Sequence, residues 1–236
     1  MNITVMSYNT QHCLNFRTRE IDFDLIADTI RAYSADIVGL QEIRDKCADP
    51  EFDAQAEILA EKLGFYYCFA QAICIDGEKP YGNALLSRFP ILDAHTIPIP
   101  DPEVRAYDGY YETRCLLKTT VDVGGGLEVL VSHFGLNPDE QELAVRTVLA
   151  HLSDERCVLM GDFNTTPDSG ILTPIARRMY DTADTFSSPK LSFPSDNPQE
   201  KIDYIFTSRD LTVIDADIPA VVSSDHRPHL ATIVLP

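Results

Sequence analysis

The stretch Arg156-Cys-Val-Leu-Met-Gly-Asp-Phe-Asn164 carries most of the information about the fold of this chain. Residues 156–160 form a short apolar run, which predicts a buried strand. Gly161 follows, and a glycine allows the backbone to turn tightly or to approach another strand closely. Asp162 and Asn164 are two residues apart, so in extended geometry their side chains point the same way. The stretch therefore predicts a buried strand that ends in a converging carboxylate and amide.

Strand and helix patterns alternate on both sides of this stretch, which indicates an α/β chain. The expected strands are residues 2–8, 36–41, 65–75, 83–87, 92–99, 112–121, 127–132, 156–160, 201–207, 211–217 and 230–235, and the expected helices are residues 22–33, 52–63 and 138–152. Segments 76–82, 100–111 and 187–199 are expected to be loops. Since no linker or repeat interrupts residues 1–236, we predict a single domain.

The composition excludes several classes of protein. The chain has 236 residues, 44% of them hydrophobic, and a formal net charge of −18. This hydrophobic content excludes a disordered acidic tail, and no apolar run reaches the roughly 18 residues of a membrane span. The negative field repels phosphate, which excludes a basic nucleic-acid-binding module. An enzyme that meets phosphate through a bound cation is still allowed.

The expected compartment is the cytoplasm. The first residues, Met1-Asn-Ile-Thr-Val-Met6, carry no targeting signal and read directly as a strand. The chain has six cysteines but no CxxC pair and no zinc-type Cys/His spacing. We therefore expect reduced thiols, most of them buried.

Polar residues follow or end several predicted strands: Asn9, Glu42, His133, Asp162 and Asp203. In open α/β sheets, ligands bind at the strand ends. Taken alone, Asn9 reads as a strand terminator with a turn-forming amide, and His133 as a structural histidine. Glu42 ends an apolar run, and a buried carboxylate there needs a cation or hydrogen bonds.

A second constellation lies near the C-terminus. Asp203 lies inside the apolar strand Ile202-Asp-Tyr-Ile-Phe206 and must find a partner. His226, in Ser224-Asp-His-Arg-Pro228, is the obvious mate, because a carboxylate would fix its tautomer and raise its pKa. Its neighbour Asp225 is expected to point elsewhere. Such oxygen-rich groups suit Mg²⁺, or Mn²⁺ in its place, and not zinc.

With these residues in place, the sequence resembles the endonuclease/exonuclease/phosphatase superfamily of metal-dependent phosphohydrolases. The resemblance rests on motifs that occur in the family's order: Ser7-Tyr-Asn-Thr10, Leu40-Gln-Glu42, Gly82-Asn-Ala-Leu-Leu-Ser-Arg-Phe-Pro90, Ser132-His133, Gly161-Asp-Phe-Asn164, Ile202-Asp-Tyr-Ile-Phe206 and Ser224-Asp-His226. It implies a four-layer α/β sandwich of two packed mixed β-sheets flanked by helices, with the active site in a cleft at one edge.

The resemblance also implies roles for individual residues. Asp162 would orient or deprotonate the attacking water, and Asn164 would position phosphate or nucleophile. His226 with Asp203 would act on the phosphate, and His133 would contact it.

Three further positions would hold metal. Glu42 resembles the principal Mg²⁺ ligand, with Asn9 beside it, and Asp225 resembles a residue ascribed to a metal site.

Two positions separate the branches of the family. Apurinic-site endonucleases usually have Asp where this chain has Gln11, and Tyr where it has His133. The chain is thus more similar to pancreatic deoxyribonucleases, sphingomyelinases and phosphoinositide phosphatases. Arg114 and Asn83 are candidate substrate-binding residues, although a surface ion pair is an equal reading of Arg114.

The expected function is hydrolysis of a phosphodiester or phosphomonoester by in-line attack of water. The scarcity of basic tracks favours a small or lipid-derived phosphate ester, and nucleic acid is not favoured by charge. Two alternatives stay open: an acidic Mg²⁺-dependent nuclease, and a non-catalytic binding module on the same fold. Tyrosines of loop 100–111 either stack on a base or sugar or cover the core.

Overall fold

Strands and helices alternate along the computed structural model, which describes residues 1–49 and 52–236. The strands of this described part are β1 (Asn2–Asn9), β2 (Ile37–Arg44), β3 (Tyr66–Ile75), β4 (Lys79–Ser87), β5 (Ile91–Pro98), β6 (Cys115–Val121), β7 (Leu127–His133), β8 (Cys157–Asp162), β9 (Tyr180–Asp181), β10 (Asp203–Thr207), β11 (Thr212–Asp217) and β12 (His229–Val234). Its α-helices are α1 (Phe23–Ala32), α2 (Gln55–Leu63), α3 (Pro138–His151) and α4 (Thr173–Arg178).

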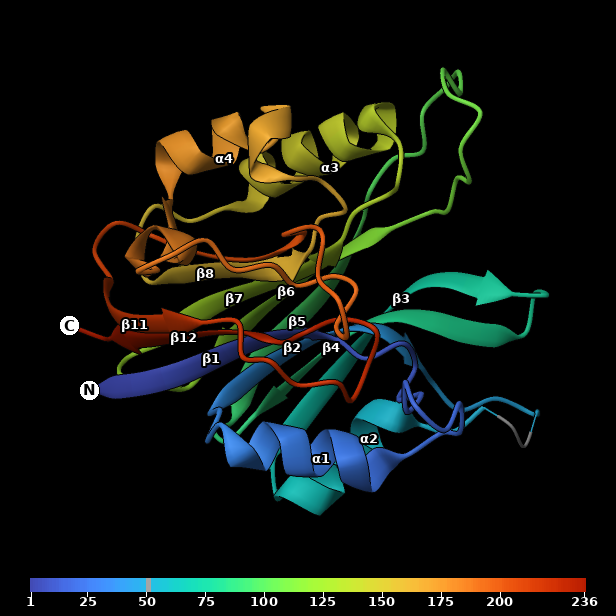
Figure 1. Cartoon of the computed structure of the whole chain (residues 1–236), viewed down its shortest axis with the longest axis horizontal. Coiled ribbons are helices and arrows are strands. Elements are labelled where there is room, and N and C mark those ends of the chain that lie inside the picture. The colour runs from blue at the N-terminus through green and yellow to red at the C-terminus, as the bar shows by residue number, and fades with distance from the viewer. Residues whose placement is uncertain (50–51) are drawn as a thin grey trace.

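The strands form two mixed sheets of six, packed face to face. One sheet has the order β11-β12-β1-β2-β4-β3, and the other has the order β5-β6-β7-β8-β10-β9. In Figure 1, α1 and α2 cover the outer face of the first sheet, and α3 and α4 cover that of the second. The predicted four-layer α/β sandwich is thereby confirmed.

Three apolar clusters hold these layers together, one at each interface. The middle cluster contains Val5 and Ile37 of the first sheet and Val131 and Met160 of the second. The sheets approach closely at Gly39, where an added Cβ would lie 2.6 Å from the sulfur of Met160. The outer clusters bury the apolar faces of the helices against their own sheets. Because both faces of each sheet are covered, the central strands read as continuous apolar runs.

The helices begin and end at capping residues that are visible in the sequence. The side chain of Asp22 accepts the backbone N–H of Leu25 at 2.9 Å and caps α1. Gly64 ends α2 in a left-handed conformation (φ 70°), which glycine adopts without steric cost. At the start of α3, the carboxylate of Glu140 accepts the backbone N–H of Asn137 at 3.1 Å.

Some elements differ from the expectation. Strand β2 does not end before Glu42 but runs on to Arg44, through a register shift against β4 between Leu40 and Ile43. Strand β6 begins only at Cys115, because residues 112–114 leave the sheet. Helix α4 and the two-residue strand β9 fall in segment 165–186, which has no clear sequence pattern.

All six cysteines are free thiols, of which Cys13, Cys115 and Cys157 are buried. This agrees with the expected reduced thiols, but only half of them are buried. Within residues 1–49 and 52–236, no helix is both long and apolar enough to cross a membrane.

Candidate active site

Four polar side chains gather where strands end at one edge of the sandwich. Asn9 is the last residue of β1, His133 of β7 and Asp162 of β8, while Asp203 is the first residue of β10. Strands β7 and β8 are parallel, so His133 lies opposite Asp162. Strand β10 is antiparallel to β8, which pairs Asp203 with Asp162. Sheet register therefore brings His133, Asp162 and Asp203 together, and the packing of the two sheets adds Asn9 from β1. All four side chains are buried.

Glycine is required immediately before Asp162. A Cβ added to Gly161 would lie 1.9 Å from the carbonyl oxygen of Ser132 on the neighbouring strand. Real Cβ contacts do not come this close, so any side chain would push β7 and β8 apart. The expected close backbone approach at Gly161 is confirmed, and it holds His133 and Asp162 at neighbouring positions.

Asp162 lies at the centre of the site. Its Oδ2 accepts a hydrogen bond from Nδ2 of Asn9 at 3.0 Å. The same oxygen lies 3.5 Å from Nε2 of His133 and 3.6 Å from Nε2 of His226. Burial, opposed by the charge of His226 and reinforced by that of Asp203, raises the pKa of Asp162 to about 7. A carboxylate with this pKa can take up a proton near neutral pH.

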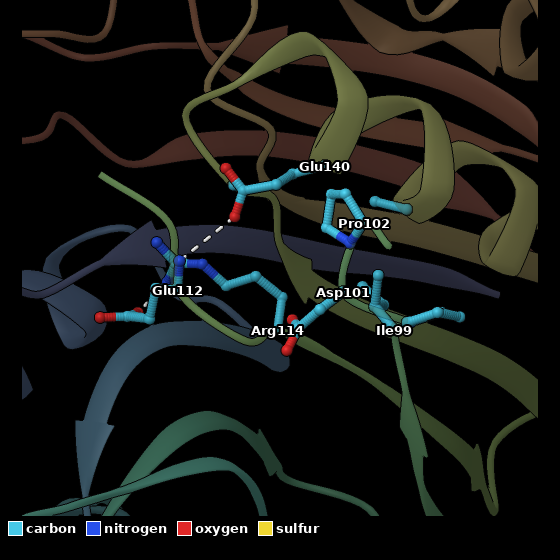
Figure 2. A pocket seen from close by; sticks show the side chains of 9 residues that line it. Ile99, Asp101, Pro102, Glu112, Arg114 and Glu140 are labelled. Atoms are coloured by element: carbon cyan, nitrogen blue, oxygen red, sulfur yellow. Dashed lines mark hydrogen bonds and ion pairs between the residues drawn. The ribbon is translucent and has the colours of Figure 1, made fainter. Parts of the chain in front are cut away.

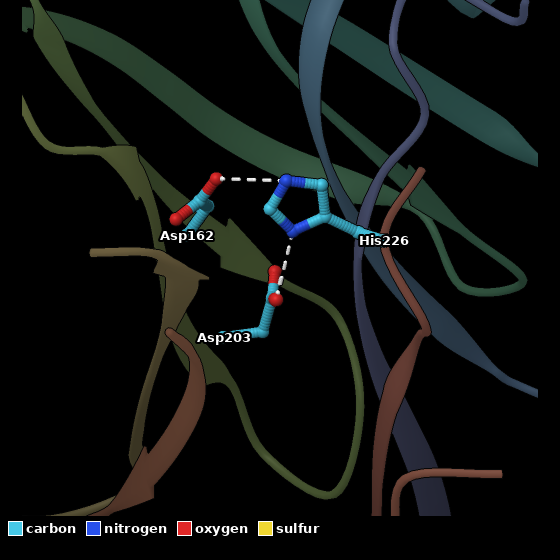
Figure 3. A group of neighbouring side chains, drawn as sticks. All are labelled: Asp162, Asp203 and His226. Atoms are coloured by element: carbon cyan, nitrogen blue, oxygen red, sulfur yellow. Dashed lines mark hydrogen bonds and ion pairs between the residues drawn. The ribbon is translucent and has the colours of Figure 1, made fainter. Parts of the chain in front are cut away.

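His226 forms the expected pair with Asp203. Its Nδ1 lies 2.9 Å from Oδ2 of Asp203, as Figure 3 shows, and the ring of Phe193 packs against it at 4.7 Å. Burial lowers the pKa of His226, but the charges of Asp203 and Asp162 outweigh it and raise that pKa to about 10. The ring is therefore an imidazolium at neutral pH, held between two carboxylates.

His133 has the opposite surroundings. Its Nδ1 lies 3.0 Å from Nη1 of Arg114, and its Nε2 lies 3.0 Å from Nδ2 of Asn164. Burial and the positive charges of Arg114 and His226 hold its pKa well below the usual range. The ring of His133 is therefore neutral.

The backbone of Asn164 is not extended as the sequence predicts, but its side chain still lies in the site. Its backbone is left-handed (φ 48°), and its N–H donates to Oδ1 of Asp162 at 3.0 Å. Asn is one of the residues that tolerate this conformation. The turn brings the amide of Asn164 beside His133, so the expected convergence is confirmed although its expected geometry is not.

Glu42 lies at the same edge, on the first sheet. Its left-handed backbone (φ 61°) coincides with the register shift in β2. Oε1 accepts a hydrogen bond from Nδ2 of Asn9 at 3.1 Å, and Oε2 accepts one from the hydroxyl of Tyr81 at 2.8 Å. Burial and the charge of Glu42 both raise the pKa of Asp225, against the opposing charge of His226. Glu42 and Asp225 are thus close enough for their charges to interact.

The oxygen-rich donor set fits a hard divalent cation. Glu42 and Asp225 supply carboxylate oxygens, and their mutual repulsion is relieved when a cation binds. The amide of Asn9 presents its nitrogen to Glu42 and Asp162, while its oxygen accepts the N–H of Gln11 at 3.1 Å. Asn9 could ligate through oxygen only after its amide turns.

A second, tighter group of metal-ligating type lies beside the first. One ligand atom from each of Asp162, Asp203 and His226 lies within 4.8 Å of the others. Among the described residues, Oδ1 of Asp203 finds no hydrogen-bond partner although it is buried, so this group retains an unused acceptor. Within it, Nδ1 of His226 is already engaged by Asp203, so Nε2 could serve as a ligand only after the imidazolium loses its proton.

The two expected substrate-binding residues both make contacts within the protein. Asn83 is buried between the sheets, where its Nδ2 donates to the carbonyl oxygen of Cys115 at 3.1 Å. Arg114 forms an ion pair with Glu112 at 2.7 Å, but this pair is largely buried and lies behind His133. Both side chains are thus committed to protein contacts. In loop 100–111, Tyr107 and Tyr110 are exposed while the hydroxyl of Tyr111 donates to Asp139.

Sequence reasoning missed two residues that hold the site. Tyr81 binds Glu42, and Glu112 holds Arg114. Tyr81 directly precedes the motif that starts at Gly82, which is the one signal that could have pointed to it. Glu112 carried no signal, because its role depends on the path of residues 112–114 outside the sheet.

Comparison with known proteins places this geometry in a family. The model of the Endonuclease/Exonuclease/phosphatase family matches residues 6–226. The chain therefore belongs to this family and has its phosphohydrolase fold. No curated protein matches the sequence as a relative.

Several solved structures share the fold. An endonuclease/exonuclease/phosphatase from Beutenbergia cavernae has a TM-score of 0.80 at 23% identity, over 99% of this chain and 72% of that one. The mannosyl-6-phosphatase Bt3783 of Bacteroides thetaiotaomicron has a TM-score of 0.74 at 17% identity, over 99% and 100% of the two chains. TDP2 of D. rerio, humanized by 14 mutations, has a TM-score of 0.73 at 16% identity, over 99% of each chain.

Proposed function

We propose that this chain hydrolyses a small or lipid-derived phosphate ester, by in-line attack of water on phosphorus. The observation that carries the proposal is the environment of Asp162. One of its oxygens lies within 3.6 Å of an amide donor and of two histidine rings. A buried acid among donors suits a reaction that moves a proton and stabilises negative charge in one place.

Asp162 takes the proton of the attacking water in this proposal. With a pKa of about 7, a large fraction of the Asp162 carboxyl groups is ionised at neutral pH, and the carboxylate is basic enough to accept a proton. The N–H groups of Asn9 and Asn164, each 3.0 Å from one of its oxygens, orient the carboxylate.

The charged and neutral histidines serve the phosphoryl group. His226, kept cationic by Asp203, stabilises negative charge on the phosphoryl oxygens. His133 and Asn164 face the same region from the other side of Asp162. Because strand ends hold these groups in place, little reorganisation is needed during the reaction.

A divalent cation would be held by Glu42, Asp225 and Asn9. Bound there, Mg²⁺ or Mn²⁺ would supply Lewis-acid polarisation of a phosphoryl oxygen and stabilisation of the leaving oxygen. The group of Asp162, Asp203 and His226 could hold the cation instead only if His226 gave up its proton.

Charge supports a small substrate. The net charge of −18 repels long polyanions, and loop 100–111 adds Asp101, Glu103 and Asp108 with only Arg105 in balance. The mannosyl-6-phosphatase among the structural neighbours is named for a small sugar phosphate.

A nuclease is the second candidate, and the exposed rings of Tyr107 and Tyr110 favour it. Exposed aromatic rings can stack on bases. Another structure of D. rerio TDP2, with a TM-score of 0.70, contains a single-stranded DNA product.

A substrate screen tests the proposal. Purified protein with Mg²⁺ or Mn²⁺ is assayed on bis-p-nitrophenyl phosphate, p-nitrophenyl phosphate, lysophospholipids and plasmid DNA. We expect turnover of a small or lipid ester that EDTA abolishes and that Asp162→Asn lacks. Turnover of DNA alone would establish the nuclease instead. Inactivity on every substrate would favour a non-catalytic binding module.

A further inference from the structure

His133 has a hydrogen-bond donor at each ring nitrogen. Nη1 of Arg114 lies 3.0 Å from Nδ1, and Nδ2 of Asn164 lies 3.0 Å from Nε2. A neutral imidazole has one lone pair and one N–H, so it can accept only one of these two bonds. The position of the ring proton therefore depends on which neighbour donates the stronger hydrogen bond to the lone pair.

Arg114 donates the stronger hydrogen bond. Its guanidinium is always charged and only donates, so a bond from it to Nδ1 is charge-assisted. Glu112 holds the guanidinium in place through an ion pair at 2.7 Å, with side-chain exposures of 10% and 16% for Arg114 and Glu112. The proton of His133 then resides on Nε2, directed toward Asn164 and Asp162.

Asn164 cannot avoid this arrangement by turning its amide. Its Nδ2 also lies 3.0 Å from the carbonyl oxygen of Phe134, which only accepts hydrogen bonds. Turning the amide would bring two oxygens together. Two N–H donors thus stand side by side, and among the described residues the acceptor near Nε2 is Oδ2 of Asp162 at 3.5 Å.

We infer that Arg114 is a positioning residue that fixes the proton of His133 on Nε2, so that His133 and Asn164 together present two N–H donors to one anionic phosphoryl oxygen. This inference rests on the proposed phosphoester hydrolysis. It makes His133 a donor to the substrate, and excludes it as a general base. It also gives Arg114 a role in place of the direct phosphate contact that the sequence indicated.

The surroundings of Arg114 argue against direct contact with substrate. Figure 2 shows the pocket beside it, which is lined by Glu112, Glu140, Asp101 and Pro102. The space within measures about 10 Å³, which is room for about one water molecule. Three carboxylates on this wall would also repel a phosphate. The guanidinium therefore has no room for a substrate on this side, and it contacts the site through His133.

The position of the ring proton can be measured without substrate. Full-length protein labelled with ¹⁵N-histidine is examined by NMR in Mg²⁺ buffer, and the signals of His133 are assigned by their loss in His133→Asn. We expect Nε2 to be protonated and Nδ1 unprotonated. In Arg114→Met, a clearly measurable fraction of the ring should move its proton to Nδ1. Arg114→Lys, which keeps a cationic donor, should restore the wild-type pattern.

Arg88→Met is the matched control, because Arg88 forms an ion pair with Asp36 at 3.1 Å and is far more exposed. It should leave the His133 signals unchanged. A proton on Nδ1 in the wild type, an unchanged pattern in Arg114→Met, or an equal change in Arg88→Met would overturn the inference. If Arg114→Met does not fold, Glu112→Gln, which frees the guanidinium, should shift the proton partially. An unchanged pattern there would count against the inference.

Kinetics supply the second readout. Loss of a preorganised donor costs roughly 10²–10³-fold in kcat, so Arg114→Met should lose about 10²-fold, with Arg114→Lys largely restored. Full activity in Arg114→Met would contradict the role. If the wild type is inactive but has the expected proton position, only the proposed hydrolysis is contradicted. If the wild type is active but carries the proton on Nδ1, only the role of Arg114 is contradicted.

Discussion

The two halves of the site contain the same side chain in opposite states. His133 and His226 are 6% and 5% exposed, so both lose nearly the same contact with water. Arg114 beside His133 lowers its pKa further, whereas Asp203 beside His226 reverses the effect of burial and raises its pKa to about 10. The comparison shows that the residue behind each ring, and not burial, decides which histidine carries charge.

Because of this difference in charge, the two histidines have different proposed roles beside Asp162. On one side stands a neutral ring that donates a hydrogen bond, and on the other an imidazolium that supplies positive charge. Asp162 lies 3.5 Å and 3.6 Å from the two rings. Changing either partner or the carboxylate between them should break the arrangement in a distinct way.

The largest effect is expected from Asp162→Asn, which removes the group shared by both halves. General-base catalysis contributes about 10²–10⁴-fold, so kcat should fall on the order of 10³-fold. The amide keeps one acceptor oxygen in place of two, so the variant should remain folded at the assay temperature with a lower melting temperature. Steady-state kinetics and thermal unfolding measure both effects. A variant within tenfold of the wild-type kcat would show that Asp162 is not the proton acceptor.

Asp203→Asn should reduce the charge difference between the histidines. The pKa of His226 should fall from about 10, because Asp162 and Asp225 are then the carboxylates left to oppose burial. We expect kcat to fall about 10²-fold, because one preorganised charge is lost. An NMR titration of His226 gives the pKa, and the state of His133 serves as the internal control. A pKa that stays near 10 would mean that Asp203 is not its cause.

Metal binding should stabilise the acidic edge of the first sheet. Stabilisation by a bound ligand is about 2.7 kcal/mol at 100 times Kd. Mg²⁺ should therefore raise the melting temperature of the wild type, and EDTA should reverse the rise. Glu42→Gln should lose most of this response, whereas Glu142→Gln on the exposed face of α3 should keep it. An equal response in both variants would move the metal away from Glu42.

The smallest effect concerns a third histidine. His229 is fully buried, and burial together with the charge of Lys201 lowers its pKa to about 3. Its pKa in the unfolded chain is about 6.5, so the unfolded state binds more protons below that pH. The free energy of unfolding is therefore undiminished above pH 6.5 and falls as the pH drops toward 3.

Between pH 6.5 and 5 this residue should cost about 2 kcal/mol of stability. His229→Gln removes the titrating group, so its stability should fall less steeply over this range. Urea unfolding at several pH values measures the slope. Equal slopes in the wild type and His229→Gln would show that another group controls acid unfolding.

Much of the fold could be predicted from sequence because burial on both faces leaves a plain signature. The run before Gly161 reads as a buried strand, and Gly64 and Pro138 mark helix boundaries. Helix α4 could not be found, since six residues carry too little periodicity. The left-handed backbone at Glu42 could not be found either, because tertiary packing imposes it.

For the site too, some features could be predicted from the sequence and others could not. Strand-end chemistry identified Asp162, and the desolvation cost of Asp203 identified its pairing with His226. The contact of Arg114 with His133 could not be predicted, because it joins neighbouring strands through residues that leave the sheet. The roles of these residues, the single domain and the cytoplasmic location stay predictions.

The most direct test of the account is the protonation of the two site histidines, measured in one sample. An NMR titration of ¹⁵N-histidine protein from pH 6 to 8 reads both rings together. We predict that His226 is doubly protonated and His133 singly protonated throughout this range. Titration of both rings together near pH 6.5 would contradict the account.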